Sequence, residues 1–204
     1  MSRAGRLARG GALLLLASVL LSGCDALRTR YNQALWQLLQ GHSAAGVAEL
    51  QALADAGYAP AQFRLGMMYR AGQHLPQDAS LALRWIERAA RQDQVGAQYW
   101  LARFYFEGFG VVSDAAHGVV WLRRLAERGY APAQFLLSDC YEHGRGVMAD
   151  PAAALQWRIA AARAGHREAQ RTLAEVYRRG GLGQVPDPHQ AEYWQRQAEL
   201  PALF

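Results

Sequence analysis

The sequence predicts an all-α protein, an α-solenoid of about five antiparallel helix hairpins, for which we expect a right-handed superhelix. A period of 36 residues runs through most of the chain. Alanine, the best helix former, occurs 39 times among the 204 residues. With 51% hydrophobic and 19% charged residues, the composition is also far from that of disordered proteins. These features favour thin, stacked hairpins over one globular core.

Residues 1–23 have the layout of a bacterial lipoprotein signal peptide. An apolar run over 10–21, too short to span a bilayer, follows three basic residues, Arg3, Arg6 and Arg9. The next residues, Leu21-Ser22-Gly23-Cys24, resemble a lipobox, in which the cysteine is acylated and becomes the first residue of the mature chain. We therefore expect lipidation at Cys24. An ordinary signal peptide, or a signal anchor that happens to contain a cysteine, is the alternative.

Removal of this segment would change the charge of the chain. The whole sequence carries a net charge of +5 and has a pI of 9.6. Residues 1–23 hold three arginines and no acidic residue, so the remainder has 19 arginines against 17 acidic residues, a net charge of +2. We therefore expect no nucleic-acid partner. A lipid anchor would place the protein in the bacterial cell envelope, facing the periplasm. The inner and the outer membrane stay as alternatives for the site of the anchor.

A short helix pair and four longer hairpins are predicted after Cys24. Residues 26–41 and 43–56 look like a degenerate pair, so we assign 24–56 to a capping unit. The seven residues from Gly57 to Phe63 recur unchanged from Gly129 to Phe135, a shift of two periods. The four predicted repeats cover 57–93, 94–129, 130–165 and 166–199. The apolar tail 200–204 either caps the last hairpin or inserts into a partner.

Each repeat contains the signals of two helices. Helical spacing of apolar residues in the first repeat predicts a helix from about Pro60 to Ala71, ended by Gly72. A column of small residues on this first helix lets a neighbouring helix approach: Gly66, Ala102, Ser138 and Ala174. The second helices are predicted to begin at Asp78, Asp114, Asp150 and Asp187, where a carboxylate suits an N-cap. They continue with a tryptophan column, Trp85, Trp121, Trp157 and Trp194.

The repeated columns resemble a known family. The order Ala-x-x-x-Leu-small-x-x-Tyr-x-x-Gly, followed by a short loop, aspartate and tryptophan, is similar to the Sel-one-like repeat, a relative of the tetratricopeptide repeat. The resemblance covers about 57–199 and implies a non-enzymatic scaffold for protein partners. Relatives serve in cell-envelope assembly, exopolysaccharide export, secretion systems and host interaction. The chain departs from the pattern at Gln92-Asp93, at Leu125 and in an insertion over 181–185.

Candidate catalytic and metal-binding residues have simpler structural interpretations. The aspartates recur once per hairpin, as N-caps do. Cys140 lies near His143, but the other residues of its column are Met68, Phe104 and Val176. This column predicts a buried core cysteine, with a metal ligand or a reactive thiol as the alternative. Neither a phosphate-binding loop nor a Gly-x-Ser-x-Gly motif occurs in the sequence. We therefore expect no enzyme activity, no cofactor and no bound metal.

The predicted partner surface is the face of the first helices opposite their packed columns, which we expect to be exposed. Residues on this face vary from repeat to repeat. Aromatic residues and arginine are enriched in binding hot spots, so the candidates for partner contact are Arg64, Met67, Tyr99, Trp100, Arg103 and Phe106. Packing of the aromatic residues against the adjacent hairpin is the alternative.

The sequence as a whole predicts a membrane-anchored scaffold that docks an unidentified envelope protein. Two other functions stay open. The first is a receptor or enzyme that acts on peptidoglycan or polysaccharide through the aromatic residues. The second is a modulator displayed outside the cell for interaction with a host.

Overall fold

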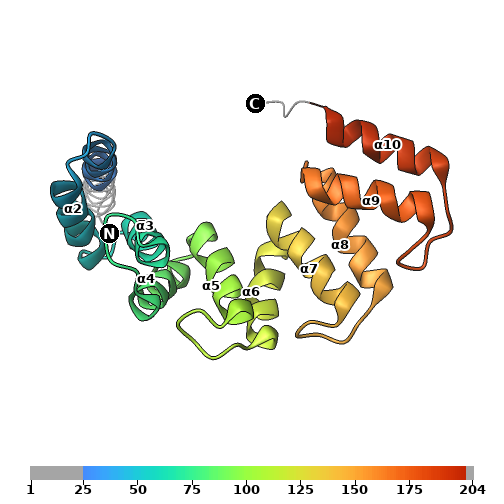
Figure 1. The fold of residues 1–204 in the computed structure, drawn as a ribbon, viewed down its shortest axis with the longest axis horizontal. Coiled ribbons are helices and arrows are strands. Elements are labelled where there is room, and N and C mark those ends of the chain that lie inside the picture. The colour runs from blue at the N-terminus through green and yellow to red at the C-terminus, as the bar shows by residue number, and fades with distance from the viewer. Residues whose placement is uncertain (1–24, 201–204) are drawn as a thin grey trace, which may run out of the picture. The chain divides into compact units, whose positions relative to one another are not determined.

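A computed structural model describes residues 25–200 of the chain, which are mostly helical (Figure 1). Residues 25–39 form a first helical segment. The labelled helices of the described residues are α2 (Ser43–Asp55), α3 (Ala59–Ala71), α4 (Ala79–Arg91), α5 (Val95–Glu107), α6 (Ala115–Glu127), α7 (Ala131–His143), α8 (Pro151–Arg163), α9 (Arg167–Arg179) and α10 (Pro188–Glu199). An isolated bridge between Gly181 and Gln184 is the β-structure found among these residues. The predicted all-α fold is confirmed. The predicted signal peptide, Cys24 and residues 201–204 lie outside the described residues.

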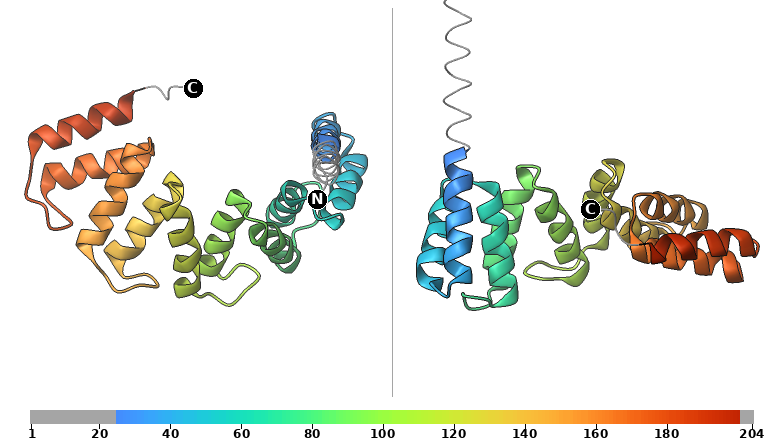
Figure 2. Two further views of the ribbon diagram at one scale, coloured as in Figure 1. Left: turned by 180° about the vertical axis from the view of Figure 1, so that it is seen from behind. Right: turned by 90° about the horizontal axis from the view of Figure 1, so that it is seen from above.

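The chain divides after Asp78 into two compact units, 1–78 and 79–204. In unit 1, α2 packs on α3. In unit 2, helices α4 to α10 pack each on the next, and α5–α6, α7–α8 and α9–α10 form antiparallel hairpins (Figures 1 and 2). The division falls inside the first predicted repeat, whose two helices belong to different units. Within residues 25–200, no helix is long and apolar enough to cross a bilayer.

The first helix of each hairpin begins and ends close to the predicted positions. Proline lies in the first turn of α3 and of α7, where its missing N–H is not needed. Gly72, Gly108 and Gly144 end α3, α5 and α7 in the left-handed conformation, and each of their N–H groups donates to the carbonyl four residues back. Gly180 after α9 has a ψ of 154° instead, and the inserted residues form the loop to α10.

Aspartate side chains cap three of the second helices, as predicted, whereas the cap of α4 by Asp78 stays a prediction. Asp114, Asp150 and Asp187 accept hydrogen bonds from backbone N–H groups in the first turns of α6, α8 and α10, with N···O distances of 3.0 Å. The bond from the backbone of His117 lowers the pKa of Asp114 below its usual range. This aspartate column therefore has a structural role in starting the helices.

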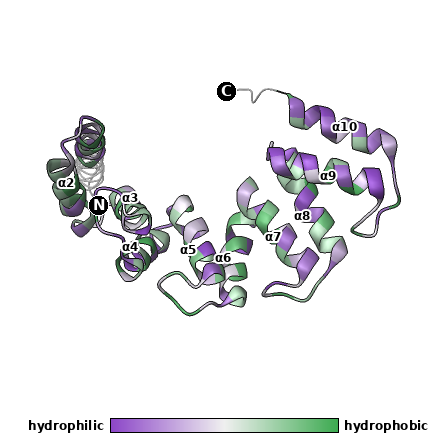
Figure 3. Cartoon of the chain, in the orientation of Figure 1, coloured by the Kyte–Doolittle hydropathy of each residue, from purple (hydrophilic) through white to green (hydrophobic). Residues whose placement is uncertain are grey.

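The small and apolar columns form the core. All four residues of the small column are buried: Gly66, Ala102, Ser138 and Ala174. Cys140 is 1% exposed, and burial raises the pKa of its thiol to about 11, so the thiol is protonated and inert at neutral pH. Of the labelled helices, α9 and α10 are the most hydrophilic (Figure 3).

A column of buried glutamines ties each hairpin to the helix before it. Nε2 of Gln62, Gln98, Gln134 and Gln170 donates to the carbonyl eight residues back, at 3.0, 3.2, 3.0 and 3.0 Å. These carbonyls belong to the last turns of α2, α4, α6 and α8. The hydrogen bond explains why glutamine recurs at a buried position, where its polar group needs a partner.

Replacing one of these glutamines by glutamate is expected to destabilise the chain. In Gln134→Glu, an acceptor replaces the donor that faces the Ala126 carbonyl, so we expect a loss of about 1–3 kcal/mol at pH 7. Protonation at pH 5 restores a donor, so part of the loss should be recovered there. Urea unfolding at both pH values measures the difference. The exposed Gln156→Glu on α8 is the control, and an equal loss in both variants would contradict the role of the buried bond.

His166 is expected to make stability depend on pH. Its Nδ1 accepts from the N–H of Ala169 at 3.2 Å as the N-cap of α9, and its ring stacks on Phe135 at 4.8 Å. Burial lowers the pKa of His166 below 6.5, so the cap contributes fully above the unfolded-state value and is lost as pH falls through the folded-state value. His166→Asn keeps an acceptor without this titration. Thermal unfolding should therefore show a smaller loss between pH 7.5 and 5.5 in this variant than in wild type, and parallel losses would contradict the assignment.

Candidate functional site

Three of the predicted partner residues line one hollow in unit 2. This aromatic hollow has a volume of about 230 Å³ and is lined by Tyr99, Arg103, Phe106, Glu107, Leu136 and Arg145. The first four residues belong to α5, Leu136 belongs to α7, and Arg145 follows α7. Because Tyr99, Arg103 and Phe106 lie at positions i, i+4 and i+7 of one helix, they share a face of α5.

We predicted that the side chains of the partner surface are exposed, and for most of them this prediction is wrong. The structure leaves four of them half-buried: Tyr99, Trp100, Arg103 and Phe106. The Tyr99 ring packs edge-to-face on Tyr130 of the next hairpin, with a centroid distance of 5.7 Å. Phe106 lies against Gly118 of α6, so closely that a Cβ at Gly118 would be 2.8 Å from the ring. Packing on neighbouring helices therefore takes up part of each aromatic surface.

Arginines hold the rim of the aromatic hollow. The Arg103 guanidinium lies 4.6 Å above the Trp100 ring and pairs with Glu107 at 2.5 Å. Arg145 covers Phe106 at 5.2 Å from the ring centre. Burial raises the pKa of Tyr99, and the nearby Arg103 offsets this only in part. The Tyr99 hydroxyl is therefore protonated at neutral pH, and the hollow combines apolar surface with hydrogen-bond donors.

Of the other three predicted partner residues, Trp100 lies beneath Arg103 without being part of the lining, and two lie elsewhere. Arg64 and Met67 belong to α3 in unit 1, where Arg64 is exposed and Met67 is half-buried. All residues that line the aromatic hollow belong to unit 2. The structure therefore assigns Arg64 and Met67 no place in this hollow, and their contact with a partner stays a prediction.

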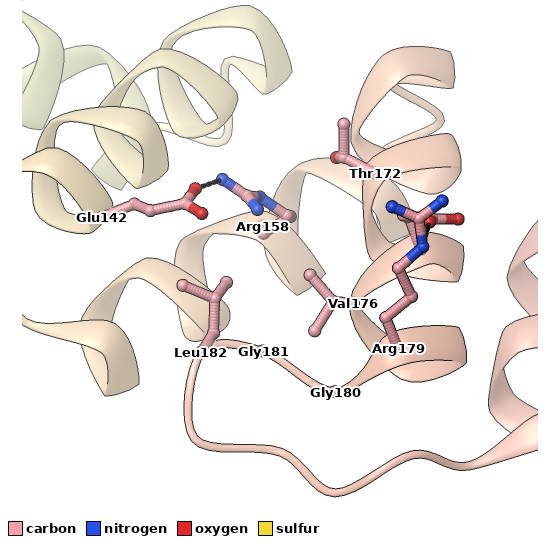
Figure 4. Close-up of a pocket in the computed structure, with 9 residues that line it drawn as sticks. Glu142, Arg158, Thr172, Val176, Arg179, Gly180, Gly181 and Leu182 are labelled. Atoms are coloured by element: carbon pink, nitrogen blue, oxygen red, sulfur yellow. Dashed lines mark hydrogen bonds and ion pairs between the residues drawn. The ribbon is translucent and has the colours of Figure 1, made fainter.

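A second hollow was not predicted from the sequence. This ion-pair hollow has a volume of about 300 Å³, and its lining includes Glu142, Arg158, Thr172, Val176, Arg179 and Leu182. Figure 4 shows the Glu142 and Arg158 side chains directed toward one another, with Val176 and Thr172 on α9 and Leu182 on the loop that follows it. The hollow thus lies between the α7–α8 and α9–α10 hairpins.

Arg158 is the unusual residue of the ion-pair hollow. It is only 5% exposed, its Nε donates to Ser138 Oγ at 3.2 Å, and its Nη2 pairs with Glu142. The equivalent residues one and two repeats earlier are Leu122 and Ile86, both fully buried. An arginine that follows two apolar residues in its column, together with the single hydroxyl in the small column, is the sequence signal that could have found this group.

The 36-residue period matches one family of repeat proteins. The Sel1 repeat model matches residues 59–94, 95–130, 131–166 and 167–198. The chain belongs to the Sel1 repeat family. Sel1 repeats are related to tetratricopeptide repeats and generally mediate protein–protein interaction; proteins built of them are typically non-enzymatic scaffolds. Among curated proteins, none matches the chain.

Two solved structures of Sel1 proteins are similar to this chain. A Sel1 repeat protein from Oxalobacter formigenes superposes with a TM-score of 0.76 at 26% identity, over 87% of this chain and 72% of the other. A protective antigen of uropathogenic Escherichia coli, c5321, gives a TM-score of 0.71 at 33% identity, over 74% of this chain. The match spans only 32% of that antigen's length. These similarities establish the solenoid architecture of the repeats.

The two hollows lie at equivalent places in successive Sel1 repeats. Three lining positions of the aromatic hollow recur 36 residues later in the ion-pair hollow: Phe106 and Glu142, Leu136 and Thr172, Arg145 and Gly181. Equivalent positions in stacked repeats face the same way. The hollows are therefore consecutive on one face of unit 2, with different chemistry in each.

One group of metal-ligand side chains adjoins the ion-pair hollow. Ligand atoms of Asp139, Glu142 and His143 lie within 4.8 Å of one another. Both carboxylates already face arginines, because Glu142 pairs with Arg158 and Asp139 lies 3.7 Å from Arg145. The group is therefore explained as an ion-pair network on α7 and its neighbours. That the chain binds no metal stays a prediction.

Proposed function

We propose that this Sel1 chain is a lipid-anchored lipoprotein of the bacterial cell envelope that acts as a scaffold and holds another envelope protein at the membrane. The aromatic hollow carries the proposal. It gathers tyrosine, phenylalanine and two arginines between two hairpins; all three types are enriched in interfaces, and tyrosine and arginine also in binding hot spots. The lipobox around Cys24 supports the anchor.

A protein partner suits the aromatic hollow better than a sugar polymer. Sugar rings bind by stacking on an open aromatic face. The Trp100 face is occupied by Arg103, and the Phe106 face by Arg145. The guanidinium groups leave hydrogen-bond donors at the rim, which match the carbonyl oxygens of a polypeptide.

Site-specific photocrosslinking in cells tests the docking role. A photoreactive amino acid at Glu107, on the rim of the hollow, should give one discrete protein adduct at native expression. The adduct should be lost when Phe106→Ser is added. The control position is Val120 on α6, which is 64% exposed and lies outside the hollow. No adduct at Glu107, or the same adducts from both positions, would count against the scaffold.

Replacement of the lipobox cysteine tests the anchor. Cys24→Ser should abolish incorporation of labelled palmitate and leave the chain unprocessed or released from the membrane fraction. An Arg28→Ser variant controls for substitution near the site. If Cys24→Ser still gives the same processed, membrane-bound form, the lipoprotein assignment is wrong.

A further inference from the structure

Two departures from the repeat pattern meet at the ion-pair hollow. In the third repeat, Ser138 and Arg158 replace residues that are small or apolar in the preceding repeat. In the fourth repeat, the insertion brings Leu182 to the hollow on a backbone with a φ of +49°. A column fixed by packing alone would keep its apolar residues, because burying a charge is costly unless it is paired. The coincidence of both departures indicates a surface shaped for an occupant.

The walls of the ion-pair hollow define the chemistry of that occupant. Among the described residues, Arg158 donates to Ser138 and Glu142, which uses two of the five N–H groups of a guanidinium. On the opposite side, Glu175 pairs with both Arg178 and Arg179. The lining itself holds two arginines and two glutamates, so the hollow presents donors and acceptors without a net charge. Val176 and Leu182 add apolar surface.

A neutral carboxamide group matches the lining of the ion-pair hollow better than a charged group does. Its carbonyl oxygen accepts from a guanidinium, and its NH₂ group donates to a carboxylate, whereas an acidic or basic side chain meets a group of its own sign. The volume of about 300 Å³ accommodates an asparagine or glutamine side chain with its flanking peptide groups. The methylene groups of the side chain would contact Val176 and Leu182.

We propose that the ion-pair hollow binds an asparagine or glutamine side chain of the partner segment whose apolar side chain occupies the aromatic hollow. This inference rests on the proposed scaffold function and deepens it. The two hollows are one repeat apart, and an extended chain advances about 3.3 Å per residue. The two side chains would therefore be several residues apart in an extended peptide.

Selection of peptides tests the proposal directly. A phage-displayed library of random dodecapeptides is selected on the full-length chain in detergent micelles. We expect enriched sequences to share an aromatic or large aliphatic residue and, at a constant spacing of several residues, asparagine or glutamine. In a synthetic peptide of the enriched sequence, replacement of that asparagine or glutamine by alanine should weaken binding about tenfold, the effect of two modest hydrogen bonds.

Two variants of the chain separate the hollows. Ser138→Ala/Arg158→Leu restores the residues found at Ala102 and Leu122 in the preceding repeat, and should abolish the amide preference while the aromatic preference persists. Thr172→Trp, which fills the ion-pair hollow from α9, should give the same result, and it provides a second test if the double variant does not fold by circular dichroism. Arg171→Trp, at an exposed position of α9 that lines neither hollow, is the matched control and should retain both preferences.

The outcomes distinguish this inference from the scaffold function. The selected peptides could keep the aromatic residue but carry an acidic residue, or no preferred residue, at the second position. That result overturns the amide subsite, while the scaffold function stands. An amide preference that survives in both hollow variants overturns the subsite as well. If no peptide is enriched on the wild-type chain, both proposals fail.

Discussion

Gly146→Ala is expected to destabilise the chain by about 3 kcal/mol or more, through a clash between two hairpins. Gly146 lies in the loop between α7 and α8 with a φ of +72°, a conformation that L side chains rarely adopt. A Cβ there would lie 2.3 Å from the carbonyl oxygen of Ala115 and 2.4 Å from its carbonyl carbon. Because these atoms are backbone at the start of α6, neither can rotate away. Urea unfolding of the purified variant measures the loss.

Gly129→Ala is the matched control for Gly146→Ala. Gly129 has a similar φ of +83°, but a Cβ there would meet no atom within 4 Å. Its replacement therefore isolates the cost of the left-handed conformation, about 1 kcal/mol. Equal losses in the two variants would show that backbone strain, and not the close approach of hairpins, explains the glycine. Gly110 makes the equivalent approach to Ala79, at 2.4 Å from its carbonyl oxygen, and should behave like Gly146.

The regular part of the fold could be predicted because each repeat uses the same local solutions. Helix ends at Gly72, Gly108 and Gly144 and caps at the aspartates depend on bonds within a few residues, so a column in the sequence reveals them. The contact of Gly146 with Ala115 joins residues from different hairpins. Such contacts depend on how the hairpins stack, which the columns alone do not specify.

The aromatic hollow could be predicted only in part. Residue type pointed to Tyr99, Arg103 and Phe106, and the structure brings these three together. Their partial burial could not be read from helix periodicity, because it arises from the neighbouring Tyr130 and from the missing side chain at Gly118. One period later, Ala154 stands at the place of Gly118. An aromatic side chain at position 142 would therefore meet the methyl group of Ala154. This accounts for the longer, flexible glutamate side chain at this position.

The ion-pair hollow was missed because its residues are far apart in sequence and unlike their columns. Arg158 and Glu142 are 16 residues apart and lie on different helices. Averaging over the four repeats hides Arg158, because the first two residues of its column, Ile86 and Leu122, are apolar. The deviations from a column carry information about specificity, whereas the constant residues carry information about the fold.

Glu142→Gln is expected to destabilise the chain by about 3 kcal/mol, because it leaves the Arg158 cation buried without its carboxylate. The value lies at the lower end for a buried pair since the Glu142 side chain is 32% exposed. Urea unfolding at pH 7 measures the loss. The exposed pair on α10 provides the control, and Glu192→Gln, which removes the carboxylate from Arg196, should cost about 0.5 kcal/mol or less.

Ser138→Ala/Arg158→Leu should keep the stability of wild type or exceed it, although it removes the same ion pair. The substitutions restore the apolar residues of the preceding repeat, and replacing a buried charge by a well-packed apolar side chain is often neutral or stabilising. Glu142 is exposed enough to turn toward water once the cation is gone. A loss of about 3 kcal/mol in this variant would instead show that the ion pair stabilises the fold by itself. Wild-type stability, together with loss of the amide preference, would show that the pair is retained for binding.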